Sequence, residues 1–175
     1  MKWRIKYFFD MDGVLAKWSN VSIEETYEKG FFRTRDPEQV MIDVVTMMIL
    51  NGYDAGLLSQ AYNDDHSVDD KNGWAYGNGL GDVNRIYVPY GEDKHKYLPE
   101  DDGNVLYVLI DDFTKNLFSW ESAGKKFVGI KFMKGINGTH GTWNGYMVTN
   151  RMSAEKIFTA ITSIAEAEAA RRFAA

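Results

Sequence analysis

Five short apolar runs divide this chain, and they limit its possible folds more than any other feature of the sequence. Each run is rich in branched or aromatic residues and is bounded by polar residues or glycine, which is typical of a buried β-strand. The runs span residues 5–9, 53–58, 85–88, 105–110 and 127–132. The sequence therefore predicts five strands, which are enough for a sheet.

Helical signals lie between these runs. Asp36 is predicted to cap a helix that has Pro37 as its first residue, Gln39 completing a capping box and Gly52 past its end. A second helix is predicted to start at Ser153, because apolar residues then recur on one face (Ile157, Ile161, Ile164, Ala165). Strands that alternate with helices indicate a three-layer, doubly wound α/β fold with a parallel sheet, formed by a single domain over residues 1–175.

Two segments interrupt this alternation. Residues 15–35 are too many for a tight connection between the first strand and its helix, so we expect a small cap or lid there. Residues 134–150 contain repeated glycines, and we interpret them as a loop or hairpin added near the last strand.

Charge and composition exclude several classes of protein. The chain has 20 basic and 25 acidic residues, a net charge of −5, and so lacks the basic field of a non-specific nucleic-acid binder. It has no cysteine, which excludes disulfides, thiolate zinc sites and a cysteine nucleophile. No apolar run approaches the roughly 20 residues that span a bilayer, and the N-terminus lacks a signal-peptide cleavage site. We therefore expect a cytoplasmic protein that binds neither a nucleic-acid duplex nor a membrane.

Polar residues follow the predicted strands. Ligands of an open parallel sheet bind beyond the carboxyl ends of its strands, so the residues at these ends are the first candidates for a site. They supply carboxylates, a hydroxyl and an ammonium group to one edge of the sheet (Asp10, Asp12, Gly13, Ser59, Gln60, residues 90–94, Asp111, Asp112).

The acidic residues suit phosphoryl transfer. Asp10 can attack a phosphoryl group to form an aspartyl-phosphate, and Asp12 can protonate the leaving oxygen and later deprotonate water. Gly13 permits the turn that brings both to the edge of the sheet. Grouped carboxylates would repel a phosphate, so a hard divalent cation is required, and Mg²⁺ suits oxygen ligands. We expect Asp10, the backbone carbonyl of Asp12 and Asp112 to hold it; Asp111 either ligates the ion directly or orients a water molecule.

Four of these stretches form short motifs, in this order along the chain: FFDMDGV (8–14), LLSQ (57–60), EDK (92–94) and LIDD (109–112). Together they resemble the haloacid dehalogenase superfamily of phosphohydrolases. VPYGEDK (88–94), LIDDFTKNL (109–117) and GINGTHG (135–141) resemble the bacterial and phage branch of the 5′-nucleotidase family within it. The resemblance implies a Rossmann-like phosphatase domain with a small cap at residues 15–35.

The resemblance also implies roles at matching positions. Ser59 would hydrogen-bond the phosphoryl group, Lys94 would neutralise its charge, and backbone amides after Asp10 and Ser59, including those of Gly13 and Gln60, would add donors. Lys96 competes with Lys94 for this role, and the family spacing favours Lys94. The second acid, Asp12, argues against a dehalogenase.

Aromatic residues in the cap segment are candidates for specificity. Trp18, Tyr27, Phe31 and Phe32 could stack on a base, with Phe32 or Trp18 preferred, or they could pack the cap against the body of the domain. The acidic string of Asp64, Asp65, Asp69 and Asp70 is interpreted as a solvated loop or a helix start.

The function that we expect is Mg²⁺-dependent hydrolysis of a nucleoside 5′-monophosphate, with deoxyribonucleotides included. Two alternatives stay open: a phosphatase for another small phosphate ester such as a sugar phosphate, and a non-catalytic protein that binds a phosphate ligand. The expected partner is a small-molecule phosphate ester, and a homodimer is left open.

Overall fold

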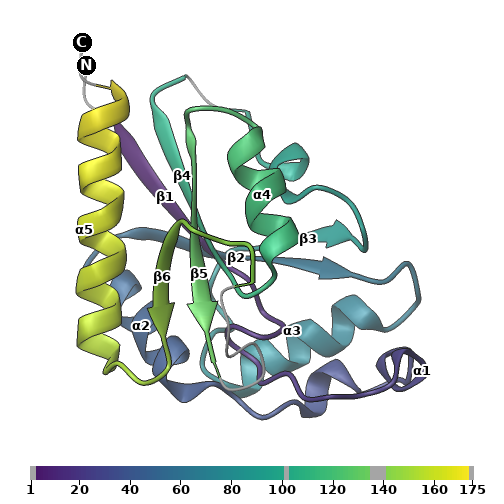
Figure 1. Cartoon of the computed structure of the whole chain (residues 1–175). Coiled ribbons are helices and arrows are strands. Elements are labelled where there is room, and N and C mark those ends of the chain that lie inside the picture. Colours follow the sequence, from purple (N-terminus) through teal and green to yellow (C-terminus); the bar gives the residue numbers. More distant parts are fainter. Residues whose placement is uncertain (1–2, 101–102, 135–140, 174–175) are drawn as a thin grey trace.

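The structure is a computed structural model that describes residues 3–100, 103–134 and 141–173. Within these residues, six strands form one parallel sheet in the order β3-β2-β1-β4-β5-β6 (Figure 1). This confirms the α/β fold with a parallel sheet. The strands are β1 (Arg4–Phe9), β2 (Asp54–Ala61), β3 (Arg85–Pro89), β4 (Val105–Asp111), β5 (Phe127–Met133) and β6 (Tyr146–Thr149).

All five predicted strands are present, but the expectation of a loop or hairpin over residues 134–150 is wrong in part. Tyr146 to Thr149 form the sixth strand, which pairs with β5 in parallel, whereas a hairpin would make the two strands antiparallel. Trp143 is buried before β6, and its indole Nε1 donates to the carbonyl of Tyr146 at 3.0 Å. Residues 135–140, which include most of the GINGTHG motif, lie outside the described residues.

Helices cover both faces of the sheet. They are α1 (Ile23–Thr26), α2 (Gln39–Leu50), α3 (Ser67–Gly77), α4 (Thr114–Ser122) and α5 (Ala154–Phe173), with the 3-10 helices η1 (Phe32–Thr34) and η2 (Lys94–Tyr97). Apolar side chains of α2, α3 and α5 share one core cluster with Phe9, and those of α4 share the other with Phe8. Neighbouring residues of a strand point to opposite faces of the sheet, so Phe8 and Phe9 pack into the two different core clusters.

The predicted start of α2 needs correction. The helix begins at Gln39, the side chain of Glu38 at its N-cap makes no capping bond, and Gln39 bonds to Asp43 instead of completing a capping box. The reason is that residues 36–38 are held against the chain after β1: the amide of Lys17 donates to Asp36 at 2.7 Å and that of Glu38 to Leu15 at 2.7 Å. The helix end agrees with the prediction, since Gly52 adopts a φ of +77°.

The predicted helix after Ser153 is confirmed as α5, in which Ile157, Ile161 and Ala165 are buried. No helix in the described ranges is both long enough and apolar enough to cross a membrane.

Residues 15–35 contain α1 and η1 and lie beside α3. Ser22 and Glu25 form a capping box at the start of α1. The contact with α3 is polar, because Asp70 accepts a hydrogen bond from the amide of Gly30 at 2.6 Å and pairs with Arg33 at 3.4 Å. This segment is therefore fixed to the body of the domain on its α3 side.

Candidate active site

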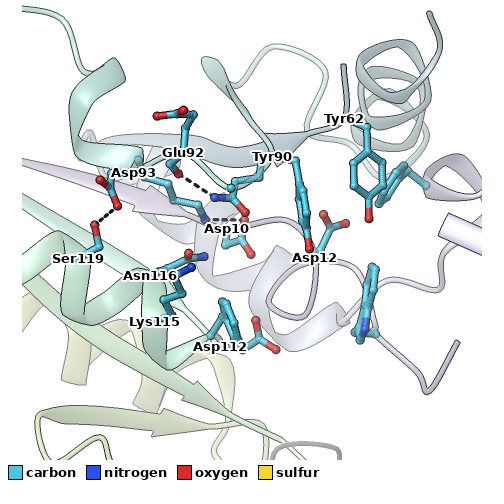
Figure 2. A pocket seen from close by; sticks show the side chains of 16 residues that line it. Asp10, Asp12, Tyr62, Tyr90, Glu92, Asp93, Asp112, Lys115, Asn116 and Ser119 are labelled. Carbon is cyan, nitrogen blue, oxygen red and sulfur yellow. Dashed lines mark hydrogen bonds and ion pairs between the residues drawn. The ribbon is translucent and has the colours of Figure 1, made fainter. Parts of the chain in front are cut away.

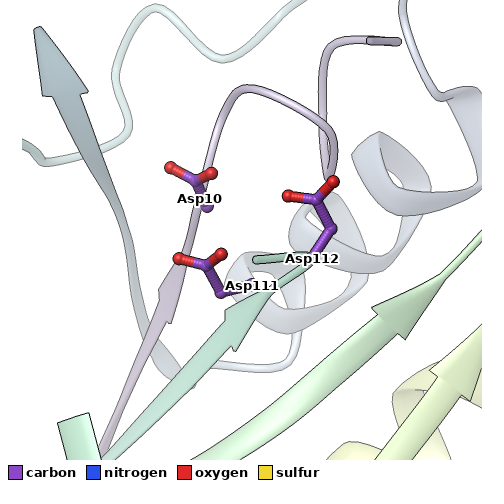
Figure 3. A group of neighbouring side chains, drawn as sticks. All are labelled: Asp10, Asp111 and Asp112. Atoms are coloured by element: carbon purple, nitrogen blue, oxygen red, sulfur yellow. The ribbon is translucent and has the colours of Figure 1, made fainter. Parts of the chain in front are cut away.

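Three carboxylates meet where β1 and β4 end. Asp10 directly follows β1, and its amide donates to Ile110 of β4 at 2.9 Å. Asp111 is the last residue of β4, and Asp112 follows it. One oxygen from each of the three carboxylates can be chosen so that all lie within 4.8 Å of one another (Figure 3). The parallel sheet thus brings together residues that are about a hundred positions apart, as expected for its carboxyl edge.

The ammonium group of Lys94 lies between two of these carboxylates. Its Nζ is 2.8 Å from Asp10 and 2.7 Å from Asp111. The side chain is buried, which disfavours its charge, but the two carboxylates outweigh burial and raise the pKa of Lys94. Lys96 is exposed and pairs with Asp93 at 2.9 Å. Of the two lysines in this motif, Lys94 is the one that reaches the carboxylates.

Asp111 and Asp112 differ in their surroundings. Asp111 is fully buried and accepts hydrogen bonds from the amide of Phe113 at 2.8 Å and from the side chain of Asn116 at 3.0 Å, besides the one from Lys94. Asp112 lines a pocket. The protein therefore occupies both oxygens of Asp111, and Asp112 is better placed to offer an oxygen to an ion in the pocket.

Asp10 and Asp112 are destabilised in their charged forms. Burial raises the pKa of Asp112 to about 8, and the nearby charges of Asp111 and Asp10 add to this effect. Burial also raises the pKa of Asp10, although Lys94 opposes it. A hard cation bound among these oxygens would offset their repulsion, and all of the donors are of the kind that Mg²⁺ prefers.

The turn after Asp10 depends on a glycine. Gly13 adopts a φ of +89°, and a Cβ at this position would collide with the carboxylate of Asp112. Its amide donates to the carbonyl of Ala16 at 2.8 Å. Glycine is therefore required both for the backbone conformation and for the close approach of the two segments.

Asp12 lines the pocket, and its carboxylate forms an ion pair with the ammonium group of Lys71. Lys71 comes from α3, is fully buried, and also contacts Ser59, whose Oγ lies 3.3 Å from its Nζ. Ser59 is itself fully buried, two residues before the end of β2. Sequence reasoning did not select Lys71.

The pocket above the carboxylates has a volume of about 500 Å³. Figure 2 shows Tyr62 and Tyr90 on the side of Asp12, and Lys115 and Asn116 on the opposite side. Gln60 also lines the pocket, and its side-chain amide donates to the carbonyl of Glu92 at 2.8 Å.

Aromatic rings from four parts of the chain border this pocket, including that of Phe113 after β4. Trp18 and Phe32 come from the segment after β1, and Tyr62 and Tyr90 follow β2 and β3. The rings of Tyr62 and Tyr90 are 4.8 Å apart, and those of Tyr62 and Phe32 are 5.8 Å apart. Sequence reasoning included Tyr90 only within residues 90–94 and gave its ring no role, and it did not select Tyr62, although Tyr62 follows β2 directly, where the same rule would have found it.

The four aromatic candidates of residues 15–35 do not have equal access to the pocket. Trp18 and Phe32 line it, but Phe32 is only 5% exposed. Phe31 packs edge-on against Trp18 with ring centroids 5.8 Å apart, and Tyr27 stacks on Tyr62 at 4.4 Å. Trp18 therefore presents more of its surface to a ligand than Phe32 does.

The acidic string after β2 includes a helix start, as one of its two interpretations predicted. Asp64 accepts hydrogen bonds from the amides of His66 and Ser67 at 3.0 and 2.6 Å, at the beginning of α3. The interpretation as solvated residues is wrong for Asp70, which is buried against residues 30–33.

Comparison with protein-family models finds no family that matches this chain, and comparison with curated proteins finds no match either.

Proposed function

We propose that this protein is a Mg²⁺-dependent phosphomonoesterase that hydrolyses a nucleoside 5′-monophosphate through an aspartyl-phosphate at Asp10. One observation carries the proposal: Asp10, Asp112 and the Lys94 ammonium converge on a pocket in which a second acid, Asp12, lies two residues from the first. A nucleophile, an acid, a fixed cation and a set of oxygen ligands are the groups that phosphoryl transfer requires.

Asp10, Asp112 and the backbone carbonyl of Asp12 would hold the Mg²⁺ ion. Asp111 would orient the side chains of Lys94 and Asn116, which donate hydrogen bonds to it. When bound, the ion supplies positive charge that offsets the repulsion between these carboxylates and an incoming phosphate. The side chain of Lys94 supplies a second, permanent positive charge at the same place.

In the first step, a carboxylate oxygen of Asp10 attacks phosphorus and the bond from phosphorus to the ester oxygen breaks. Asp12 donates a proton to the departing oxygen, so the alcohol leaves in neutral form. The positive charge of Lys94 stabilises the negative charge that develops on the transferring group. The products of this step are the free alcohol and a phosphorylated Asp10.

In the second step, a water molecule attacks the phosphorus of the aspartyl-phosphate. Asp12, now deprotonated, takes a proton from this water, and the bond from phosphorus to the Asp10 oxygen breaks. Inorganic phosphate leaves, and both aspartates return to their starting states.

The leaving group would occupy the aromatic part of the pocket. Rings accept the flat face of a base with little regard to its identity, and Trp18, Tyr62 and Tyr90 all border the space beside Asp12. Residues 15–35 would act as the small cap of the proposed enzyme, since they contribute Trp18 and Phe32 to its wall. These features favour a nucleotide over a sugar phosphate.

A turnover assay tests the proposal. Purified protein with Mg²⁺ should release inorganic phosphate from p-nitrophenyl phosphate and, with a higher kcat/KM, from nucleoside 5′-monophosphates. Asp10→Asn is the matched control, because it keeps the size of the side chain but removes the nucleophile. Preference for sugar phosphates would reassign the substrate, and binding of a nucleotide without any turnover would replace the enzyme by a binding protein.

A further inference from the structure

Lys71 is a fully buried lysine whose ammonium group contacts three different parts of the site. Its Nζ pairs with the carboxylate of Asp12, lies 3.3 Å from the hydroxyl of Ser59, and sits over the ring of Phe32 at 4.2 Å from its centroid. We infer that Lys71 is a positioning residue that holds the carboxylate of Asp12 in place for proton transfer. The inference rests on the proposed function and deepens it.

The burial of this charge needs an explanation. A lysine is rarely buried unless its charge is paired, because transfer of an ammonium group out of water is costly. Of the contacts described, the carboxylate of Asp12 neutralises the charge, the hydroxyl of Ser59 accepts a hydrogen bond, and the face of Phe32 adds a cation–π interaction. Each partner therefore fixes the nitrogen from a different element of the fold.

A fixed nitrogen restricts the carboxylate that it pairs with. Asp12 lies in a turn rather than in a strand, so the backbone alone does not rigidly set its side chain. Lys71 comes from the buried side of α3, where Trp74 and Ala75 pack into the core. The pair thus ties a side chain of the turn to a helix that the core holds in place.

The same part of α3 also holds the cap segment. Asp70, the residue before Lys71, accepts a hydrogen bond from the amide of Gly30 at 2.6 Å and pairs with Arg33 at 3.4 Å. Phe32 lies between these two cap residues and contacts Lys71 itself. Two adjacent residues of α3 therefore join residues 30–33 to the acid that the proposed reaction uses.

A positioned acid matters most when the leaving group is poor. p-Nitrophenolate departs readily without a proton, whereas phenolate and alkoxides need one as the ester bond breaks. Loss of Lys71 should therefore slow the hydrolysis of phenyl phosphate much more than that of p-nitrophenyl phosphate. A purely structural role would lower both rates by the same factor.

The experiment compares Lys71→Met with the wild-type protein on these two esters in the presence of Mg²⁺. We expect kcat for phenyl phosphate to fall by about 10²-fold or more, the lower end of what general acid catalysis contributes, and kcat for p-nitrophenyl phosphate to fall less than about tenfold. Lys71→Arg should recover most of the loss, because it restores the positive charge. Lys96→Met is the matched control, since it breaks an exposed lysine–aspartate pair and should change neither rate.

A double-mutant cycle isolates the link to Asp12. In the Asp12→Asn background, Lys71→Met should cause no further loss of kcat on phenyl phosphate, because there is no acid left to position. This double variant also removes both charges of the buried pair, so it should fold even if the single variant Lys71→Met does not. If Lys71→Met does not fold, Lys71→Gln takes its place in the experiment, because the glutamine amide keeps a polar contact without the charge.

The outcomes separate the inference from the function on which it rests. An active wild-type protein whose two rates fall equally in Lys71→Met, or an additive double mutant, would overturn the positioning role and leave the phosphatase intact. A wild-type protein that hydrolyses neither ester, with or without Mg²⁺, would overturn both.

Discussion

Lys94 donates a hydrogen bond to Asp111 at 2.7 Å, although the two residues belong to different elements at the carboxyl edge of the sheet. Of the two lysines in residues 92–96, Lys94 is the one that lies inside the site, whereas Lys96 is exposed. The hydrogen bond from Lys94 also uses an oxygen of Asp111, which leaves Asp112 as the acid of the two that borders the pocket. Burying charged groups costs free energy, and such arrangements cluster at functional sites, so the position of the Lys94–Asp111 pair beside Asp10 favours a role in the reaction.

The first prediction compares the two lysines. Lys94→Ala should lower kcat/KM for p-nitrophenyl phosphate by about 10²-fold or more, because a cation aimed at the transferring group contributes several kcal/mol. Lys96→Ala removes an exposed pair with Asp93 and should change kcat/KM less than about twofold. Steady-state kinetics of both variants measure the ratio. The opposite ranking would place the catalytic cation two residues later in the chain.

The second prediction concerns the metal ion. Mg²⁺ should raise the melting temperature of the wild-type protein, because a ligand that binds only the folded state stabilises it. EDTA should reverse this shift and abolish turnover. Asp112→Asn should reduce the shift markedly, since it removes the negative charge of a proposed ligand while keeping the shape of the side chain. Thermal unfolding at several Mg²⁺ concentrations gives the apparent affinity, and an equal shift in wild type and variant would exclude Asp112 as a ligand.

Much of the sheet and of the carboxylate cluster was predictable from the sequence. The five apolar runs identify the strands, and a parallel sheet places Asp10 and Asp111 at one edge once those strands are known. The sixth strand was not recognised because it has four residues, of which only Val148 is buried. A short edge strand of this kind shows too little alternation to be distinguished from a loop.

The part of the site that comes from α3 could not be predicted in the same way. The helix carries Gly73 and Gly77 and few apolar residues, so its sequence lacks the usual helical pattern. Lys71 follows a run of acids, and a segment of this composition is typical of a solvated surface. Trp74 and Ala75 pack into the core on this side of the helix, and those contacts depend on the tertiary structure.

The third prediction tests the aromatic wall. Trp18→Ala and Tyr90→Ala should each raise KM for nucleoside 5′-monophosphates by about 5- to 150-fold, as stacking on a base contributes about 1–3 kcal/mol. Their effect on p-nitrophenyl phosphate should be small, because this ester reaches Asp10 without a base. Tyr97→Ala changes a tyrosine outside the pocket lining and serves as the control. A parallel loss on both substrates would mean that the rings only pack.

Phe32 should behave differently from these residues, although the sequence favoured it equally with Trp18. It is almost completely buried and contacts Lys71, so Phe32→Ala should reduce the free energy of unfolding by about 3–5 kcal/mol. We therefore expect losses on every substrate, together with a lower melting temperature. A stable variant with a defect confined to nucleotides would restore Phe32 as a stacking residue.

The last prediction concerns stability as a function of pH, at the end of α5. Glu168 accepts hydrogen bonds from Tyr146 of β6 at 2.7 Å and from Arg171 at 2.7 Å, and it also pairs with Arg172. Burial alone would raise the pKa of Glu168, but the hydrogen bonds from Arg171, Tyr146 and Arg172 outweigh it and lower the pKa to about 2. A lowered pKa means that the folded state favours the charged form.

The stabilisation by Glu168 should therefore be fully present above the pKa of the unfolded chain, 4.5, and should disappear as the pH falls through about 2. Glu168→Gln is expected to lose about 1–2 kcal/mol of unfolding free energy near neutral pH, a value limited by the solvent exposure of Arg171. Urea unfolding of both proteins across this pH range measures the difference. Glu166→Gln, on the same helix but exposed, is the matched control for the substitution itself. A difference that stays constant from about pH 7 to about pH 2 would mean that the Glu168 side chain stabilises α5 by packing and not by its charge.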